Sequence, residues 1–377
     1  MNMHKNQSAI ARLLWLERLA LILVVLVIVL GAYTRLSNAG LGCPDWPGCY
    51  GQLLVPSSEQ AVERANLAYP ERAVEPFKAW LEMVHRYFAG GLGLLVLAIA
   101  WHCFRTPKAP RVLSTLICAV ITAQALLGMW TVTLKLMPVV VMAHLLGGFT
   151  VFVLLALLYA RTRRVAQTFG IFPSSEKQTI SKPTKRKEWK TQGRRALLVG
   201  TIAWFVLAIQ ILLGGWTSAN YAALMCTTLP ICQGDWSQYL DWSTAFSFWQ
   251  TGYDNYEFGV LEYPARMTIH VAHRIGAACT LVVLGSYSFW LAWRGLANQR
   301  RFGQVLLCLL LVQVLLGVGN VVLSLPIAIA VAHNLVGALL LVVTSLSLRT
   351  LIAERSESTL VERRRQNDRG NTEVGYE

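Results

Sequence analysis

Eight long apolar segments constrain the fold of this chain more than any other feature of its sequence. Each is about 20 residues long, which is the length an α-helix needs to cross the hydrocarbon core of a bilayer. Lipid offers no partners to backbone polar groups, so we predict an all-α, polytopic membrane protein with eight transmembrane helices. The segments cover residues 15–35, 81–103, 112–134, 138–160, 196–217, 267–293, 303–323 and 327–350.

The charge distribution indicates how these helices are oriented. The formal net charge is +14, and most of the 34 Lys and Arg residues fall on the side of the membrane that holds the N-terminus. The positive-inside rule then predicts cytoplasmic N- and C-termini. No Ser- and Arg-rich transit peptide precedes the first span, which favours a bacterial inner membrane. The basic run 182–195 lacks an aromatic platform, so we expect it beside anionic lipid and expect no nucleic-acid partner.

Landmarks in the first half of the chain recur in the second. Four helices per half give both halves the same orientation, so we predict a parallel repeat of two four-helix bundles. The predicted parts are an N-terminal half (1–161), a basic cytoplasmic linker (162–195), a C-terminal half (196–352) and a cytoplasmic tail (353–377). The paired landmarks are Gly31-x-x-Thr34 with Gly214-x-x-Thr217, Cys43 and Cys49 with Cys226 and Cys232, His85-Arg86 with His273-Arg274, QALLG (124–128) with QVLLG (313–317), and His144 with His333.

Four histidines of this repeat are the candidate ligands. We expect His85, His144, His273 and His333 to lie about 8–10 Å below the outer edge of the helices. Ionisable residues inside membrane spans are costly and usually functional. Two imidazoles that face each other in a four-helix bundle can ligate a haem iron from both sides, so we predict one haem site in each half.

Other residues near the histidines fit the same interpretation. Arg86 and Arg274 each follow a histidine and are candidates for pairing with haem propionates. The glycine pairs 90–91 and 147–148 would let a flat macrocycle approach the helices. A third QxLLG copy at 210–214 accompanies those at 124 and 313, and we interpret this pattern as helix packing.

The repeat breaks at Glu82. This carboxyl lies one helical turn before His85, while the corresponding residue before His273 is another histidine, His270. A buried carboxylate beside a haem can relay protons or stabilise a developing cation, whereas a simple salt bridge with Arg86 is the structural alternative. The difference suggests that one half performs chemistry and the other moves electrons.

These motifs together resemble one known family. The stretches GAYTRLSNAGLGCPDWPGC, EMVHR, MAHLLGG, HVAHR and VAHNLVG are similar to those of the haem A synthases, over about residues 15–350. The resemblance implies oxidation of a ring methyl of haem O to a formyl group, which gives haem A for cytochrome oxidase. It also implies haem O synthase (protohaem farnesyltransferase) as a partner, and an electron acceptor that the sequence does not identify.

The resemblance also distributes roles between the halves. It implies a haem b cofactor held by His273 and His333 in the C-terminal half. The substrate haem then falls to His85 and His144, with Glu82 beside it as the catalytic carboxylate.

Four cysteines lie in the predicted outer loops, where an oxidising compartment favours disulfides. Cys43, Cys49, Cys226 and Cys232 allow three pairings. The family's first-loop cysteines map to Cys43 and Cys49. Prolines and a glycine between them hold the ends close, so we expect one disulfide within each loop. Its role is either structural or that of a labile, redox-active bond.

Two other functions are compatible with parts of the pattern. A dihaem b-type electron carrier also uses bis-histidine haems, but it needs haems at two depths to carry electrons across the membrane. A transporter would share the parallel repeat, but it needs broken helices near the midplane, and the sequence lacks paired Gly or Pro breaks there.

Overall fold

The computed structural model describes residues 2–172, 183–230 and 232–373, and within these ranges it contains helices and no strand. The four long helices of the first half are α1, α3, α4 and α5, and those of the second are α6, α8, α9 and α10. Short helices α2, η1 and α7 lie in the two long loops. The bounds are Asn2–Leu36 (α1), Glu59–Ala68 (α2), Pro76–Arg105 (α3), Arg111–Thr133 (α4), Pro138–Thr168 (α5), Pro183–Ala219 (α6), Trp236–Tyr239 (η1), Trp242–Ala245 (α7), Tyr263–Arg294 (α8), Ala297–Val322 (α9) and Ile327–Glu373 (α10).

Among the described residues, 8 helices are long and apolar enough to cross a membrane, which confirms the all-α, multi-pass prediction. Several extend beyond the predicted spans. The helices α3 and α5 begin at Pro76 and Pro138, and α8 has Pro264 in its first turn. Proline suits the first turn of a helix, where its missing N–H leaves no hydrogen bond unmade. The helices therefore continue through polar residues on either side of the apolar spans. The helices α5 and α6 reach into the predicted linker, and α10 reaches into the predicted tail. Residues 173–182 of the linker and 374–377 of the tail lie outside the described residues.

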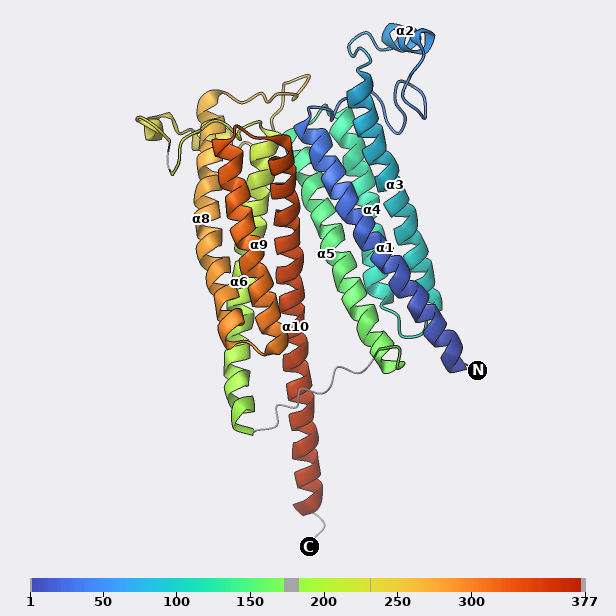
Figure 1. Ribbon diagram of the computed structural model, residues 1–377, viewed down its shortest axis with the longest axis vertical. Helices are drawn as coiled ribbons and strands as arrows, with labels where there is room; N and C mark the ends of the chain where they lie inside the picture. Colours follow the sequence, from blue (N-terminus) through green and yellow to red (C-terminus); the bar gives the residue numbers. More distant parts are fainter. Residues whose placement is uncertain (1, 173–182, 231, 374–377) are drawn as a thin grey trace.

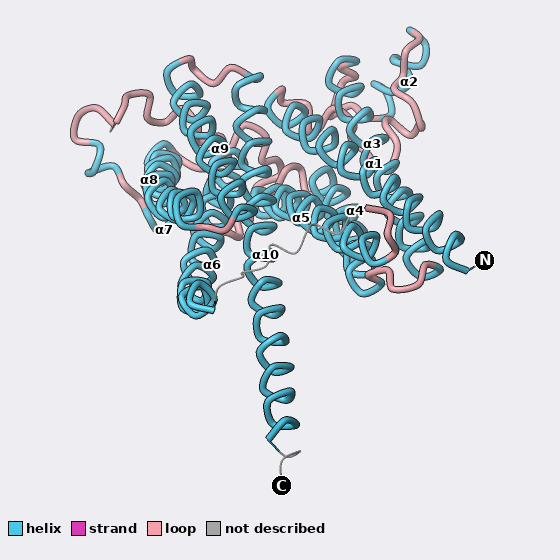
Figure 2. Tube along the Cα trace, turned by 60° about the horizontal axis from the view of Figure 1, so that its bottom comes forward, coloured by secondary structure: helices cyan, strands magenta, loops and turns pink. Residues whose placement is uncertain are grey.

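The long helices form two groups of four (Figure 1). One contains α1, α3, α4 and α5, and the other contains α6, α8, α9 and α10. The groups meet where α5 packs against α6 and α10, and where α1 packs against α10. One apolar core runs through both groups, with Phe149 and Leu155 from the first and Tyr287 and Leu291 from the second. Figure 2 shows α10 leaving its group and continuing alone toward the C-terminus.

Each group consists of two helix pairs, α1/α3 and α4/α5 or α6/α8 and α9/α10, and the first helix of every pair ends in the same turn. In this turn a backbone N–H donates to the carbonyl five residues earlier. The residue directly before the donor has a positive φ, and in the four turns this residue is Asn38, Lys135, Tyr221 or Ser324. This is the hydrogen bond that closes a Schellman-type helix end. The similarity therefore extends to single helix pairs, a shorter period than the sequence comparison indicated. The bonds are Ala39 N to Thr34 O (2.9 Å), Leu136 N to Thr131 O (2.8 Å), Ala222 N to Thr217 O (2.9 Å) and Leu325 N to Asn320 O (2.8 Å).

Polar contacts join the two halves at the end that carries the long loops. Arg35 on α1 donates to the hydroxyl of Tyr221 (2.5 Å) and to the carbonyl of Ser218 (2.8 Å). Arg72, before α3, pairs with Glu257 of the second long loop at 2.8 Å and 3.3 Å. Burial lowers the pKa of Arg72, but the hydrogen bond and charge of Glu257 outweigh it and raise that pKa above its usual value. Arg72 is therefore charged, and its ion pair with Glu257 links the loops.

We expect Arg72→Met to destabilise the contact between the halves. The carboxylate of Glu257 is 6% exposed and would lose its partner, which costs about 1–3 kcal/mol. A lower apparent melting temperature in detergent measures the effect. Lys78→Met is the control, because Lys78 pairs with the half-exposed Glu75. Equal stability of the two variants would contradict the role of the Arg72–Glu257 pair.

Candidate functional site

The four histidines lie near the loop end of their helices, one on the second helix of each pair. His85 is on α3, His144 on α5, His273 on α8 and His333 on α10. The two histidines of each expected pair lie in the same helix group, His85 and His144 in the first and His273 and His333 in the second. All four residues have intermediate accessibility within the helix groups.

Each imidazole packs against a glycine on the first helix of its own pair. A Cβ added to these glycines would come within 3.3 Å of the ring carbon Cε1, closer than most Cβ contacts in proteins. Glycine at these positions therefore gives the imidazole its room. The distances from such a Cβ to Cε1 are 2.8 Å for Gly31 and His85, 3.3 Å for Gly128 and His144, 3.0 Å for Gly214 and His273, and 3.2 Å for Gly317 and His333.

Three of these glycines close the QxLLG segments, and the glutamines of two segments contact the same histidines. Gln210 Nε2 lies 3.0 Å from His273 Nδ1 and donates to the carbonyl of His273 at 3.0 Å. Gln313 Nε2 lies 3.2 Å from His333 Nε2. The QxLLG pattern thus does more than pack helices, which the sequence analysis missed. The available signal was the constant spacing between the glycine of the motif and the end of its helix, since Gly128, Gly214 and Gly317 each lie three residues before the carbonyl that accepts the closing hydrogen bond.

The donor set fits a haem. Buried Nδ1 atoms of His85, His144 and His333 have no hydrogen-bond partner, although unpaired buried nitrogens are rare. Two facing imidazoles suit an iron that already has four in-plane ligands. Among the described residues no group of three or more His, Cys, Asp or Glu could hold a bare metal ion. Of the glycines expected to admit the macrocycle, Gly147 instead faces the amide of Gln124, while Gly90 and Gly91 face open space.

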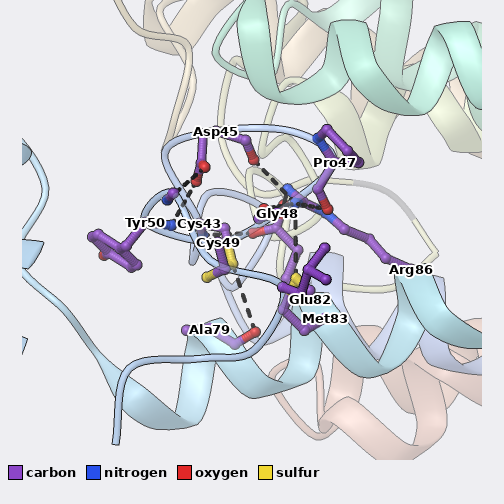
Figure 3. The surroundings of a disulfide bond; sticks show 12 residues. Cys43, Asp45, Pro47, Gly48, Cys49, Tyr50, Ala79, Glu82, Met83 and Arg86 are labelled. Atoms are coloured by element: carbon purple, nitrogen blue, oxygen red, sulfur yellow. Dashed lines mark hydrogen bonds and ion pairs between the residues drawn. A yellow bond between two sulfur atoms is a disulfide. The ribbon is translucent and has the colours of Figure 1, made fainter. Parts of the chain in front are cut away.

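A disulfide loop lies against α3, beside the helical turn that precedes His85. Cys43 and Cys49 are bonded to each other and fully buried. Glu82, on α3 below the loop, accepts a hydrogen bond from Cys43 N (2.9 Å) and pairs with Arg86 (2.5 Å). Arg86 reaches up to the carbonyls of residues 45, 47 and 48, as Figure 3 shows. Glu82 and Arg86 together therefore clamp the loop to α3, which is the salt-bridged alternative considered for Glu82.

The second disulfide loop is held by a different pair of side chains. Cys226 and Cys232 are bonded, and Arg274 donates to the carbonyls of Cys226 (2.5 Å) and Thr228 (2.7 Å). His270 takes the place of Glu82. Its Nδ1 lies 3.0 Å from the carbonyl of Ala222, and its Nε2 accepts from Arg274 Nε at 3.1 Å.

The two clamps differ in charge. Arg86 is neutralised by Glu82, whereas no carboxylate lies within ion-pair distance of Arg274 among the side chains that the structure describes. His270 is thus a loop-holding residue, a role the sequence analysis left open. The propionate role of Arg86 and Arg274 stays a prediction, since both guanidinium groups here contact the disulfide loops.

Comparison with known proteins agrees with this geometry. The chain matches the model of a family described as cytochrome oxidase assembly protein over residues 14–345. The chain belongs to this family. Among its relatives is the heme A synthase of Shewanella oneidensis, 48% identical over 350 residues that cover 92% of this chain and 99% of the relative. The heme A synthases of Mesorhizobium japonicum and Wolbachia pipientis wMel are 27% and 28% identical, each over 85% of this chain and over 85% and 87% of their own lengths.

Burial predicts different reactivity for the two disulfides of this family member. Cys43 and Cys49 are both inaccessible, while Cys232 is partly exposed. An attacking thiolate must reach a sulfur. We therefore expect dithiothreitol to reduce Cys226–Cys232 well before Cys43–Cys49 in the folded protein, measured by alkylation and peptide mass. Faster reduction of Cys43–Cys49 would show that the first loop opens.

Proposed function

We propose that this chain is a haem A synthase, which oxidises a ring methyl of haem O to a formyl group and so makes haem A. The observation that carries the proposal is the set of four imidazoles, paired at one end of two helix groups, each seated on a glycine. The heme A synthases among its relatives have the same activity by name. The chain is accordingly a membrane oxidoreductase that acts on haem O.

The two sites have different roles in this proposal. The C-terminal site, His273 and His333, holds haem b as a resident cofactor, and the N-terminal site, His85 and His144, holds the haem that is converted. Haem iron supplies the electron-transfer chemistry that a multi-electron oxidation of a methyl group requires. The difference between Glu82 and His270 supports the division, because only the N-terminal site has a carboxylate one turn from its histidine.

Glu82 is the proposed catalytic carboxylate. One carboxylate oxygen accepts from Cys43 N and the other pairs with Arg86, so its position is fixed from two sides. A preorganised negative charge stabilises positive charge that develops on the substrate without reorganising in the reaction. The loop clamp therefore also serves to hold this charge beside His85.

The surroundings of the enzyme complete the proposal. We place it in a bacterial inner membrane with both termini in the cytoplasm, where the basic segments meet anionic lipid. Haem O synthase is the proposed source of substrate, and an electron acceptor takes the electrons that the oxidation releases. A transmembrane dihaem carrier is less suitable, since all four histidines lie toward the loop end of their helices.

Removing a C-terminal ligand should remove the cofactor. We expect His333→Ala to lose the low-spin haem of the purified protein, as seen in its visible spectrum. Gly214→Ala should act in the same direction, because its methyl group would press on the His273 ring. Gly93→Ala is the matched control, as a Cβ there meets nothing within 4 Å. Full low-spin haem in His333→Ala would refute the assignment of the cofactor site.

Glu82→Gln tests the catalytic carboxylate. Glutamine keeps the size and can still accept from Cys43 N, so we expect normal insertion and normal haem b. Loss of about 3 kcal/mol of transition-state stabilisation would slow turnover about a hundredfold. Haem O or a hydroxylated product should accumulate during co-expression with haem O synthase, detected by chromatography of extracted haems. A wild-type yield and rate of haem A would leave Glu82 only its clamp role.

A further inference from the structure

The glutamine contacts divide the four histidines into two classes. In the C-terminal half both imidazoles are touched by a glutamine amide, His273 by Gln210 and His333 by Gln313. Gln210 is also seated on a glycine of the histidine's helix, since a Cβ on Gly276 would lie 2.2 Å from its Oε1. In the pair α6/α8, Gly214 of α6 therefore contacts the His273 ring of α8, and Gly276 of α8 contacts the Gln210 amide of α6.

The N-terminal half lacks both contacts, for two different reasons. On α1 the residue four before Gly31 is Val27, where α6 has Gln210, and Phe88 stands where α8 has Gly276. On α4 a glutamine is present and packs against Gly147, as Gln210 packs against Gly276, but the amide of Gln124 makes no hydrogen bond to His144 among the described contacts. The backbone carbonyls of Val27 and Gln124 lie near the two rings, as that of Gln313 lies near His333, so only the glutamine amide contact distinguishes His333 from these two histidines.

A hydrogen bond to the second nitrogen of a ligating imidazole fixes the ring's rotation and its basicity. Losing such a contact typically costs about 10–100-fold in metal affinity. A glutamine amide suits this task in either tautomer, because it can donate to a bare ring nitrogen or, turned by half, accept from a protonated one. Gln210 contacts Nδ1 of His273 and leaves Nε2 of that ring free, whereas Gln313 contacts Nε2 of His333 and leaves Nδ1 free.

We propose that Gln210 and Gln313 are positioning residues that make the C-terminal site release haem slowly. The absence of a glutamine contact to His85 and His144 would then let the N-terminal site release haem quickly. The inference rests on the proposed function, in which one haem stays and the other must leave after every turnover. It assigns the difference in residence time to two amides that contact the histidines.

The experiment measures haem release. Purified protein loaded with haem b in both sites is mixed with an excess of apo-globin, and haem transfer is followed by absorbance. We expect two phases in the wild type, with the slow phase absent from His333→Ala. Gln210→Met and Gln313→Met keep an unbranched side chain of similar length, and should speed the slow phase about 10–100-fold while leaving the fast phase unchanged.

A second readout separates hydrogen bonding from packing. Gln210→Glu places a charged acceptor beside the imidazole and should lower the midpoint potential of the slowly released haem, whereas Gln210→Met should not lower it. Gln304→Met is the matched control, since Gln304 is an exposed residue of α9 far from His333. An unchanged slow phase in both methionine variants, or equal shifts of potential in Gln210→Glu and Gln210→Met, would overturn the inference.

Failure of the proposed function looks different. If the purified chain bound no haem, or if His333→Ala kept the slow phase, the assignment of the cofactor site would be wrong whatever the glutamine variants do. If the slow phase disappears in His333→Ala but does not respond to Gln210 and Gln313, only the positioning role fails.

Discussion

The contact between an imidazole and a glycine of the neighbouring helix is the constraint on which the loop end of this protein depends. A side chain at Gly31, Gly128, Gly214 or Gly317 would push the ring away, so the helices of each pair can approach closely only in one register. Close approach at small residues is also how helices associate in lipid, where burial of apolar surface gives little driving force. The same four contacts therefore set helix packing and ligand position together.

Around these contacts the two halves have diverged in polar partners. The N-terminal half has an ion pair, Glu82 with Arg86, that holds a disulfide loop, while the C-terminal half uses a neutral imidazole and Arg274 for the same purpose. Exchanging a carboxylate for His270 preserves the loop anchor, because the imidazole bonds to a carbonyl where the carboxylate accepted from an N–H. Architecture is thus retained while the charge beside the histidine changes.

The sequence predicted much of this, and its limits have physical causes. Long apolar runs gave eight helices because lipid permits few other structures, and matched spacing found the histidines and the cysteine pairs. Side-chain contacts between helices were harder. Gln210 and Gln124 both pack against a glycine of the neighbouring helix, but only Gln210 also meets a ring. That difference depends on helix rotation, which hydropathy does not encode. The loop clamp of Arg86 was missed because its acceptors are backbone carbonyls, which carry no sequence signature.

The pairing of each histidine with a glycine of the preceding helix has a consequence for biogenesis. Helices enter the membrane in chain order, and every one of these contacts joins two successive membrane helices. Each histidine can therefore pack against its glycine as soon as its own helix pair is inserted, without waiting for the other pair of its half. Assembly of a site then requires only that two completed pairs meet, and the first half can reach that state while the second is still on the ribosome.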